Sequence, residues 1–114
     1  MHDQLCPLIA NMFQALGHPT RLAIVELLRD KGEIPVSAIR ERLGLEQANV
    51  SQHLGVLRSR QIVNGRKDGN RVLYALRDRG LVRILDLMRR QVQNHLNSTI
   101  KLLEAMDMEE NAPR

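Results

Sequence analysis

Two short stretches of helical periodicity, separated by a glycine turn, place the strongest constraint on how this chain of 114 residues can fold. Apolar residues recur at helical spacing over 36–43, and Gly44 follows as a C-terminal stop signal. A second helix is expected over 47–60, after a tight turn. Two helices joined by a turn of three or four residues that contains glycine form a helix-turn-helix. The sequence therefore predicts a helix-turn-helix over 36–60.

The remaining segments predict further helices and a β-hairpin around this motif. The expected elements are helices over 4–16, 18–31 and 80–106 and short strands over 62–63 and 72–76. The stretch between the strands, 67–71, contains the Asp-Gly pair typical of a hairpin turn. We therefore expect a mainly α fold with a small β-hairpin, a winged helix-turn-helix in which four helices precede the hairpin and one follows it. It would form one domain over 1–108, with the wing at 62–76 and a frayed tail at 109–114.

The helix over 47–60 has the composition of a helix that reads DNA bases. At about 100° per residue, Val50, Leu54, Leu57 and Gln61 fall in one inward sector. The opposite face carries amides, hydroxyls and small residues, which can bond adenine edges or contact a thymine methyl group. An ordinary solvated face would mix Glu and Lys at i, i+4, and this stretch has neither after Glu46. The predicted base-contacting residues are Gln47, Ala48, Asn49, Ser51, Gln52 and His53. For His53, at the margin of the inward sector, two alternatives stay open: packing the helix against the domain, or touching a phosphate.

The charges are unevenly distributed along the chain. Residues 40–90 carry twelve Lys and Arg against five Asp and Glu, a net charge of +7, whereas the two ends together carry −3. A basic middle favours a surface that faces a polyanion, although a merely solvated face is the alternative. The chain has only two aromatic residues of the Phe, Tyr and Trp class, which argues against base stacking on single strands or RNA. The residues expected to contact the phosphate backbone of double-stranded DNA, on and near the wing, are Arg58, Arg66, Lys67 and Arg71.

The last helix carries an apolar stripe that is too long for so small a core to cover. The stripe runs with spacings of three and four residues over about seven turns, from Leu81 to Met106. A second copy of the chain is the expected cover. The residues expected in this dimer interface, on the first and last helices, are Leu5, Leu8, Met12, Leu85, Met88, Val92, Leu96 and Leu103.

Several classes of function find no support in the sequence. No Gly-rich phosphate loop, nucleophile elbow or His–carboxylate constellation is present, so we expect neither an enzyme nor a cofactor, and no catalytic residues. No run of eighteen apolar residues is present, so we expect no transmembrane helix, and the first residues lead us to expect no secretory signal. A single cysteine, Cys6, cannot form an intrachain disulfide, which favours the reducing cytoplasm. Cys6 leaves two alternatives open, a thiol sensor and a metal ligand together with His2 and Asp3.

Three segments in this order and spacing resemble the ArsR/SmtB family of winged-helix repressors, over nearly the whole chain. They are ALGHPTRL at 15–22, LGL with VSQHL and VLR within 43–58, and the wing at 69–74. The resemblance implies a homodimer, joined through its first and last helices, that blocks transcription from an inverted-repeat operator. The alternative function is a winged-helix dimer that serves as a protein-interaction module and does not bind DNA. The effector, if there is one, and the regulated genes are not implied.

The chain departs from the family at its metal sites and at one glycine. The family's Cys-x-Cys position reads Pro35-Val36-Ser37 here, and of the four donor positions on the last helix only His95 is a metal ligand; Val82, Ile84 and Ser98 occupy the rest. Because tetrahedral zinc needs about four donors, we expect no metal at either site. Gln61 stands where the family commonly has the glycine that ends the recognition helix, so a local difference at the entry to the wing is expected.

Overall fold

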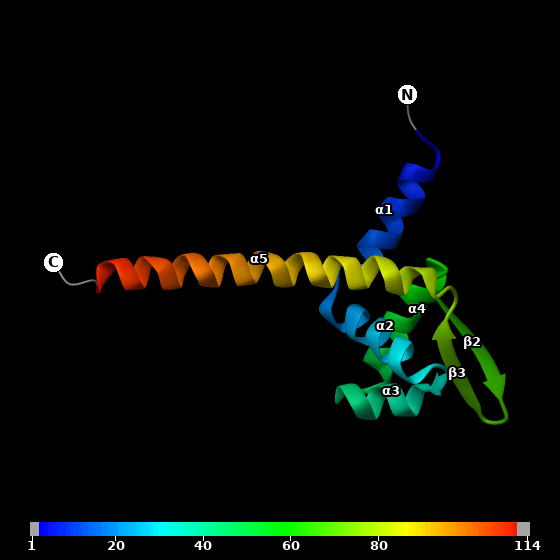
Figure 1. The fold of residues 1–114 in the computed structure, drawn as a ribbon. Coiled ribbons are helices and arrows are strands. Elements are labelled where there is room, and N and C mark those ends of the chain that lie inside the picture. The colour runs from blue at the N-terminus through cyan, green and yellow to red at the C-terminus, as the bar shows by residue number, and fades with distance from the viewer. Residues whose placement is uncertain (1–2, 112–114) are drawn as a thin grey trace. The chain divides into compact units, whose positions relative to one another are not determined.

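The computed structural model describes residues 3–111, which form helices and a small sheet (Figure 1). In chain order the elements are α1 (Leu5–Leu16), α2 (Pro19–Lys31), β1 (Ile34–Pro35), α3 (Val36–Leu43), α4 (Gln47–Ser59), β2 (Val63–Asp68), β3 (Arg71–Leu76) and α5 (Gly80–Glu110). They belong to two compact units that divide between Arg79 and Gly80, and the second unit consists of α5 and the residues after it. The predicted helices and the mainly α, winged helix-turn-helix fold are confirmed.

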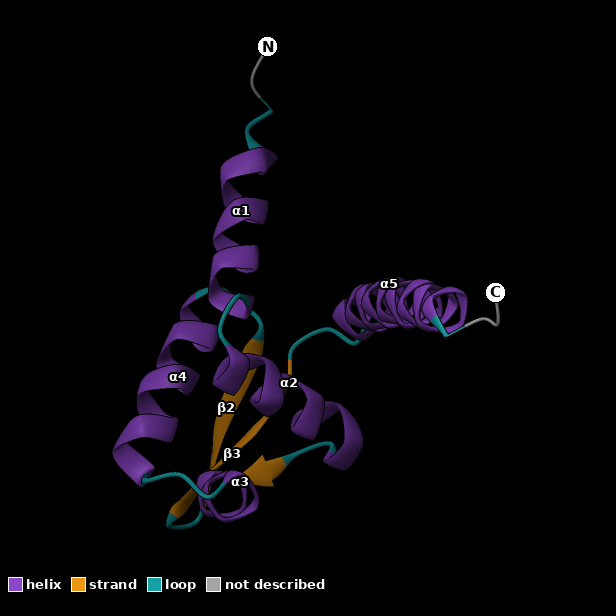
Figure 2. Ribbon diagram, turned by 90° about the vertical axis from the view of Figure 1, so that its left-hand side faces the viewer, coloured by secondary structure: helices purple, strands orange, loops and turns teal. Residues whose placement is uncertain are grey.

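The core of the first unit lies among α2, α3, α4 and the sheet (Figure 2). Val50, Leu54 and Leu57, which were predicted to face inward from α4, have no exposed surface at all. Each such aliphatic side chain stabilises the fold by about 1.5–3 kcal/mol when buried. Three anchors on one side of α4 leave its opposite side in solvent. The other buried apolar residues are Ala15, Leu16, Ile24, Val25, Leu28, Ile39, Ile62, Val63 and Leu73.

The turn between α3 and α4 depends on Gly44. This residue has φ of 64°, in the left-handed region that L side chains disfavour. Its N–H and that of Leu45 both donate to the carbonyl oxygen of Arg40, so that the last turn of α3 is capped. The chain then re-enters a helix at Gln47, and the short turn expected from the sequence is confirmed.

The sheet is larger than the expected two-stranded hairpin. It has three antiparallel strands in the order β1-β3-β2, and Ile34 and Pro35 of β1 pair with Tyr74 and Leu73 of β3. Two residues are too few to produce a strand pattern in the sequence. Proline is tolerated because β1 is an edge strand, where a missing N–H need not cost a ladder bond. The predicted order of elements therefore lacked one strand.

The hairpin itself is longer than predicted. Strand β2 extends over six residues to Asp68 and pairs in continuous register with β3, so the connecting turn is only Gly69-Asn70. The outer half of β2 is polar and exposed, and it therefore lacks the apolar alternation by which a strand is recognised in a sequence. The outer half of β2 is a strand because its backbone pairs with β3, although its side chains are not buried.

The second unit is one helix of 31 residues with no buried side chain. It continues to Glu110, past the predicted end at 106, because no proline or glycine interrupts it there. Asn111 then bonds through its backbone and side-chain nitrogens to the carbonyl oxygen of Asp107, at 3.0 and 2.9 Å. The predicted frayed tail is thus helical at residues 109–110, and 112–114 lie outside the described residues. Within residues 3–111, no helix is both long and apolar enough to span a membrane.

Candidate nucleic-acid interface

The exposed side of α4 matches the surface predicted to read bases. Gln47, Ala48, Asn49, Ser51 and Gln52 are all exposed, and no Asp or Glu lies within the helix. A Cβ atom added at Gly55 would meet no atom within 4 Å, so this side of the helix has room for close approach. An exposed face of amides and small groups without acids can enter the major groove without repelling phosphates.

His53 is the member of the predicted set that the structure places differently. Its side chain is half-buried, and its ring lies against that of His18, with the ring centroids 4.6 Å apart and an interplanar angle of 46°. Of the two alternatives for His53, this contact favours packing of the helix against the domain. The partner could not be identified from periodicity, because His18 precedes α2 and lies far away in the sequence.

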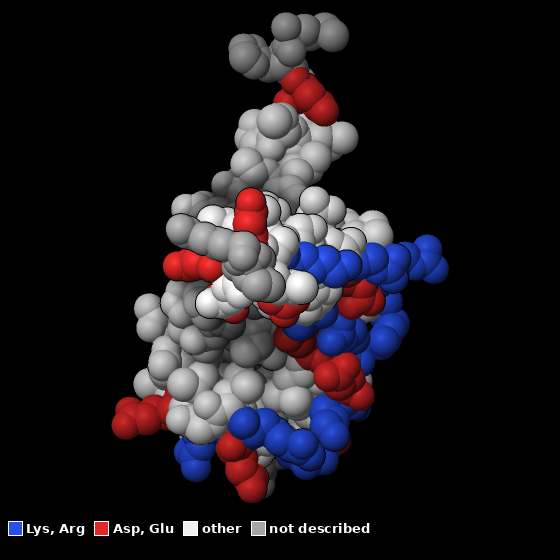
Figure 3. Space-filling model, turned by 60° about the vertical axis from the view of Figure 1, so that its left-hand side comes forward, with Lys and Arg blue, Asp and Glu red and all other residues white. Residues whose placement is uncertain are grey.

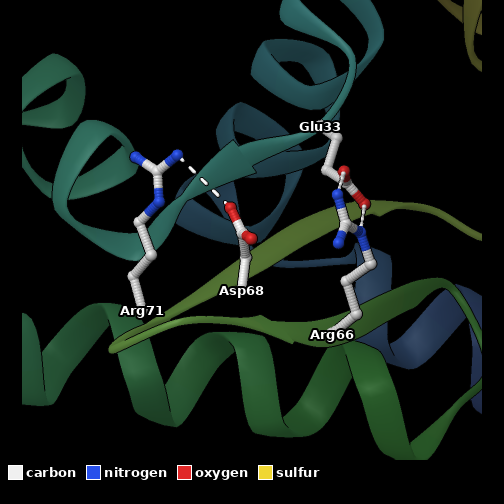
Figure 4. Close-up of polar contacts among 4 residues, drawn as sticks. All are labelled: Glu33, Arg66, Asp68 and Arg71. Carbon is white, nitrogen blue, oxygen red and sulfur yellow. Dashed lines mark hydrogen bonds and ion pairs between the residues drawn. The ribbon is translucent and has the colours of Figure 1, made fainter.

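The wing carries two ion pairs, which Figure 4 shows on one side of the hairpin. Arg66 donates from Nη2 and Nε to the two carboxylate oxygens of Glu33, at 2.6 and 2.8 Å. This pair lowers the pKa of the Glu33 carboxyl group and raises that of Arg66. Arg71 donates to Asp68 across the turn at 3.5 Å, a longer and weaker contact.

Lys67 differs from these two arginines. Because side chains alternate along a strand, Lys67 lies on the face of β2 opposite to Arg66 and Asp68. Among residues 3–111, Lys67 forms no ion pair, and its side chain is exposed. The predicted wing cations are thus one unpaired lysine and two arginines with carboxylate partners. The other predicted backbone contact, Arg58, is exposed in the last turn of α4.

The ring of Tyr74 lies close against the backbone of the wing at Gly65. Gly65 on β2 pairs with Tyr74 on β3, and a Cβ atom at position 65 would lie only 3.0 Å from Tyr74 Cε1. Only glycine allows the tyrosine ring to lie so close to the backbone of β2. A larger residue at position 65 would therefore have to displace the Tyr74 ring.

The connection from α4 to the wing passes through Gln61, which adopts φ of 63°. The predicted inward orientation of Gln61 is wrong: the residue is exposed, lies beyond the end of α4, and accepts a side-chain hydrogen bond from Arg77 Nη1. The 100° increment used for the prediction holds only inside a helix. Gln61 instead takes the left-handed conformation that a glycine would take, so the backbone turns here with an ordinary side chain in place.

Acidic and basic side chains lie next to one another on the face that Figure 3 draws. The Glu33–Arg66 and Asp68–Arg71 ion pairs are contacts of this kind within the first unit. Two of the twelve cations counted over 40–90, Arg66 and Arg71, therefore already have a carboxylate partner within the protein.

The predicted dimer residues are largely exposed in each unit. Leu5 and Leu8 on α1 are each 60% exposed, and Met12 is half-buried. On α5, Leu85 is half-buried, whereas Met88, Val92, Leu96 and Leu103 are exposed. The prediction did not include further apolar side chains that are also exposed on these helices: Ile9, Phe13, Ile84, Leu87, Ile100 and Leu102.

The described residues bring together no metal-binding cluster. Within 3–111, no three His, Cys, Asp or Glu side chains are close enough to hold a metal ion. Cys6 is a free, exposed thiol in the first turn of α1, and His95 is exposed on α5. His95 has no second ligand from the positions that the resemblance pointed to, and His2, which was considered as a ligand together with Cys6, lies outside the described residues. The absence of bound metal stays a prediction.

Comparison with known proteins connects this geometry with DNA-binding regulators. A family model described as a helix-turn-helix domain matches residues 16–66. The HTH-type transcriptional regulator Rv0081 of Mycobacterium tuberculosis is 33% identical over 102 residues, 90% of either chain. A biofilm growth-associated repressor of Xylella fastidiosa is 38% identical over 68 residues, 60% of this chain and 59% of the repressor.

Two solved structures share the fold. The crystal structure of Rv0081 has a TM-score of 0.77 at 33% identity and covers 87% of this chain and 99% of that one. The solution structure of Mb0332 from Mycobacterium bovis has a TM-score of 0.74 at 28% identity and covers 84% of this chain and 91% of that one. The latter is described as a homodimeric winged helix-turn-helix DNA-binding domain and a possible ArsR-family regulator.

Proposed function

The chain belongs to the ArsR family of winged helix-turn-helix transcriptional regulators, and from this we propose that it is a homodimeric repressor acting on an inverted-repeat operator. It is a DNA-binding regulator and not an enzyme. Repression as the output is supported by the Xylella fastidiosa relative, which is named a repressor. The proposed place of action is the cytoplasm, in contact with the DNA.

The observation that carries the proposal is the acid-free, exposed face of α4. Three fully buried residues hold the helix from the opposite side, so that Gln47, Asn49 and Gln52 extend into solvent on a rigid support. Gln and Asn amides can form two hydrogen bonds with adenine in the major groove, and each such pair contributes about 1–3 kcal/mol of discrimination. We propose that these amides, with Ala48 and Ser51, read the operator.

The wing has a different role in the proposal. Its cations face phosphates or the narrow minor groove, which fixes the position of the protein on the duplex but reads little sequence. Lys67 is the wing residue best suited to this contact because no carboxylate competes for it among residues 3–111.

The dimer is proposed from the apolar surfaces of α1 and α5. Exposed leucine and methionine side chains in such number are costly in water and are typical of a surface that another chain covers. A two-fold symmetric dimer presents two recognition helices to two half-sites, which must then form an inverted repeat. The homodimeric Mb0332 structure supports this arrangement.

The test uses the DNA upstream of the protein's own gene. Gel-shift and footprinting titrations are expected to show a protected, two-fold symmetric site that survives competition by excess mixed-sequence duplex. A duplex with one half-site scrambled is the matched control and is expected to bind at least tenfold more weakly, since one mismatched base pair alone costs about 1–3 kcal/mol. A protein that binds no duplex even at low salt would instead be the interaction module that does not use DNA.

A further inference from the structure

His18 and His53 form a contact between the start of α2 and the recognition helix. Their ring centroids are 4.6 Å apart. His18 is also the N-cap of α2, where its Nδ1 atom accepts a hydrogen bond from the backbone N–H of Thr20 at 3.1 Å. The side chain of His18 thus caps the start of α2 and also contacts His53 on α4.

This cap requires that His18 be uncharged. A ring nitrogen that accepts a hydrogen bond carries no proton, so the neutral ring holds its proton on Nε2. A proton on Nδ1 would place a donor against the Thr20 N–H and a positive charge at the positive end of the α2 dipole. The cap and the charged form of His18 exclude one another.

The surroundings of His53 also disfavour a charge. Partial burial on α4 is the first cause, followed by the repulsion that a protonated His18 would exert and by the positive charge of Arg21, and together they lower the pKa of His53. Arg21 Nε is itself buried without a hydrogen-bond partner among the described residues. Helix α1, which also packs on α4, has no Asp, Glu, Lys or Arg. The charged side chains of α3 and β2, which also pack on α4, are all exposed: Arg40, Glu41, Arg42, Arg66, Lys67 and Asp68. Besides Arg21, helix α2 carries the half-buried Glu26 and Arg29 and the exposed Asp30 and Lys31, and none of these four is among the causes of the lowered His53 pKa.

We propose that the His18–His53 pair is a positioning contact that holds recognition helix α4 against α2, and that acidification opens it and weakens DNA binding. The DNA-binding part rests on the proposed function. A histidine whose pKa is lowered by folding takes up its proton more readily in the open form. The contact is therefore fully present above the ordinary histidine pKa of about 6.5 and is lost as the pH falls below it.

The sign of the pH effect separates this role from a phosphate contact. If His53 touched a phosphate, protonation would add a charge-assisted bond, and acid would strengthen binding. If His53 positions the helix, acid weakens binding.

The first test needs no DNA. In nuclear magnetic resonance titrations of the whole chain from about pH 8 to about pH 5.5, the Thr20 amide and the hydrogen-exchange protection of Val50 and Leu54 are expected to change together with the His53 ring. His18→Asn keeps a capping oxygen without a titrating group, so its Thr20 amide should no longer respond to pH. The double variant His18→Asn, His53→Gln should keep the same α4 protection across the range.

Unchanged protection of α4 in the native protein while the His53 ring titrates would overturn the proposal, whether or not either variant folds. Titration of His95 on α5, read in the same spectra, supplies the reference for a histidine outside the first unit.

The second test measures affinity for the footprinted duplex over the same pH range. The native protein is expected to lose about fivefold in affinity, at the low end of couplings between linked sites, and the double variant to lose less. Affinity that rises with acid in the native protein but not in His53→Gln would assign His53 to a phosphate and overturn the proposal. Failure to bind any duplex would count against the proposed function, while the exchange data would still decide the contact.

Discussion

The guanidinium group of Arg66 and the carboxylate of Glu33 meet in a two-point ion pair, with Nη2–Oε1 at 2.6 Å and Nε–Oε2 at 2.8 Å. Glu33 lies directly before β1, and Arg66 lies on β2, so the pair joins the two outer strands of the sheet across β3. An exposed pair of this kind contributes little stability, but its two-point geometry orients both side chains. Arg66 therefore has a role in the wing that does not require DNA.

The pair predicts different salt dependences for two adjacent wing residues. The logarithm of the association constant for DNA falls linearly with the logarithm of the salt concentration. Lys67→Ala should make this slope less negative by about 0.9, the value for one lost phosphate contact. Arg66→Ala should leave that slope nearly unchanged, because Arg66 is neutralised by Glu33. Fluorescence anisotropy at several salt concentrations measures both. Glu33→Gln is the control: a steeper slope in this variant would mean that Arg66, once released, is a phosphate contact.

Substitution of Gln52 should separate the reading of bases from the sequence-independent binding of the DNA backbone. Gln52→Ala should weaken binding to the cognate duplex by about 1–3 kcal/mol and to mixed-sequence DNA hardly at all, because only a base contact is lost. Ser59→Ala, at the end of the same helix, is the matched control, since its hydroxyl group bonds to the Val56 carbonyl. An unchanged ratio of cognate to mixed-sequence affinity would show that Gln52 does not read the operator.

The apolar stripe of α5 should control the oligomeric state. Leu96 and Leu103 are 51% and 59% exposed, and their replacement by Glu would place charge in an apolar interface. Sedimentation equilibrium should therefore find monomers for Leu96→Glu combined with Leu103→Glu, with loss of tight operator binding. Asn94→Glu adds the same charge on the opposite side of the helix and should remain dimeric. A double variant that still dimerises would contradict the assignment of the interface.

The positive φ of Gln61 predicts that glycine is more stable than alanine at this position. Gln61→Gly should raise the free energy of unfolding relative to Gln61→Ala by about 1 kcal/mol, because only the alanine keeps a Cβ atom in the left-handed conformation. The comparison with alanine cancels the hydrogen bond to Arg77, which both variants lose. Urea denaturation measures the difference, and equal stabilities would mean that the backbone is unstrained at this position.

Zinc should not regulate this protein through either of the family's known sites. Pro35 and Ser37 supply no thiolate, and His95 alone cannot form a tetrahedral site on the last helix. Equilibrium dialysis of the reduced protein should find no tight zinc, and operator affinity should be the same with and without the metal. A tight site that survives Cys6→Ser, is lost in His95→Ala and releases DNA would identify the last helix as a sensor.

The sequence by itself determined the features that depend on neighbours along the chain. Helical spacing and Gly44 were sufficient to locate the helix-turn-helix, since each turn of a helix is made by residues three and four apart. The buried and exposed sides of α4 followed from the same period, from Val50 to Leu57. That period stops at the end of the helix, which is why the orientation of Gln61 was wrong.

Only the tertiary structure decided which distant residues meet. The pairing of β1 with β3 brings Glu33 next to Arg66 and gives a predicted phosphate ligand a carboxylate partner within the protein. The packing of α2 on α4 turns His53 toward His18, although periodicity placed His53 at the edge of the reading face. Charge and periodicity describe what a side chain can do. The partner of a side chain depends on backbone pairing and core packing between segments that are far apart in the sequence. A local sequence pattern therefore does not show which of these segments meet.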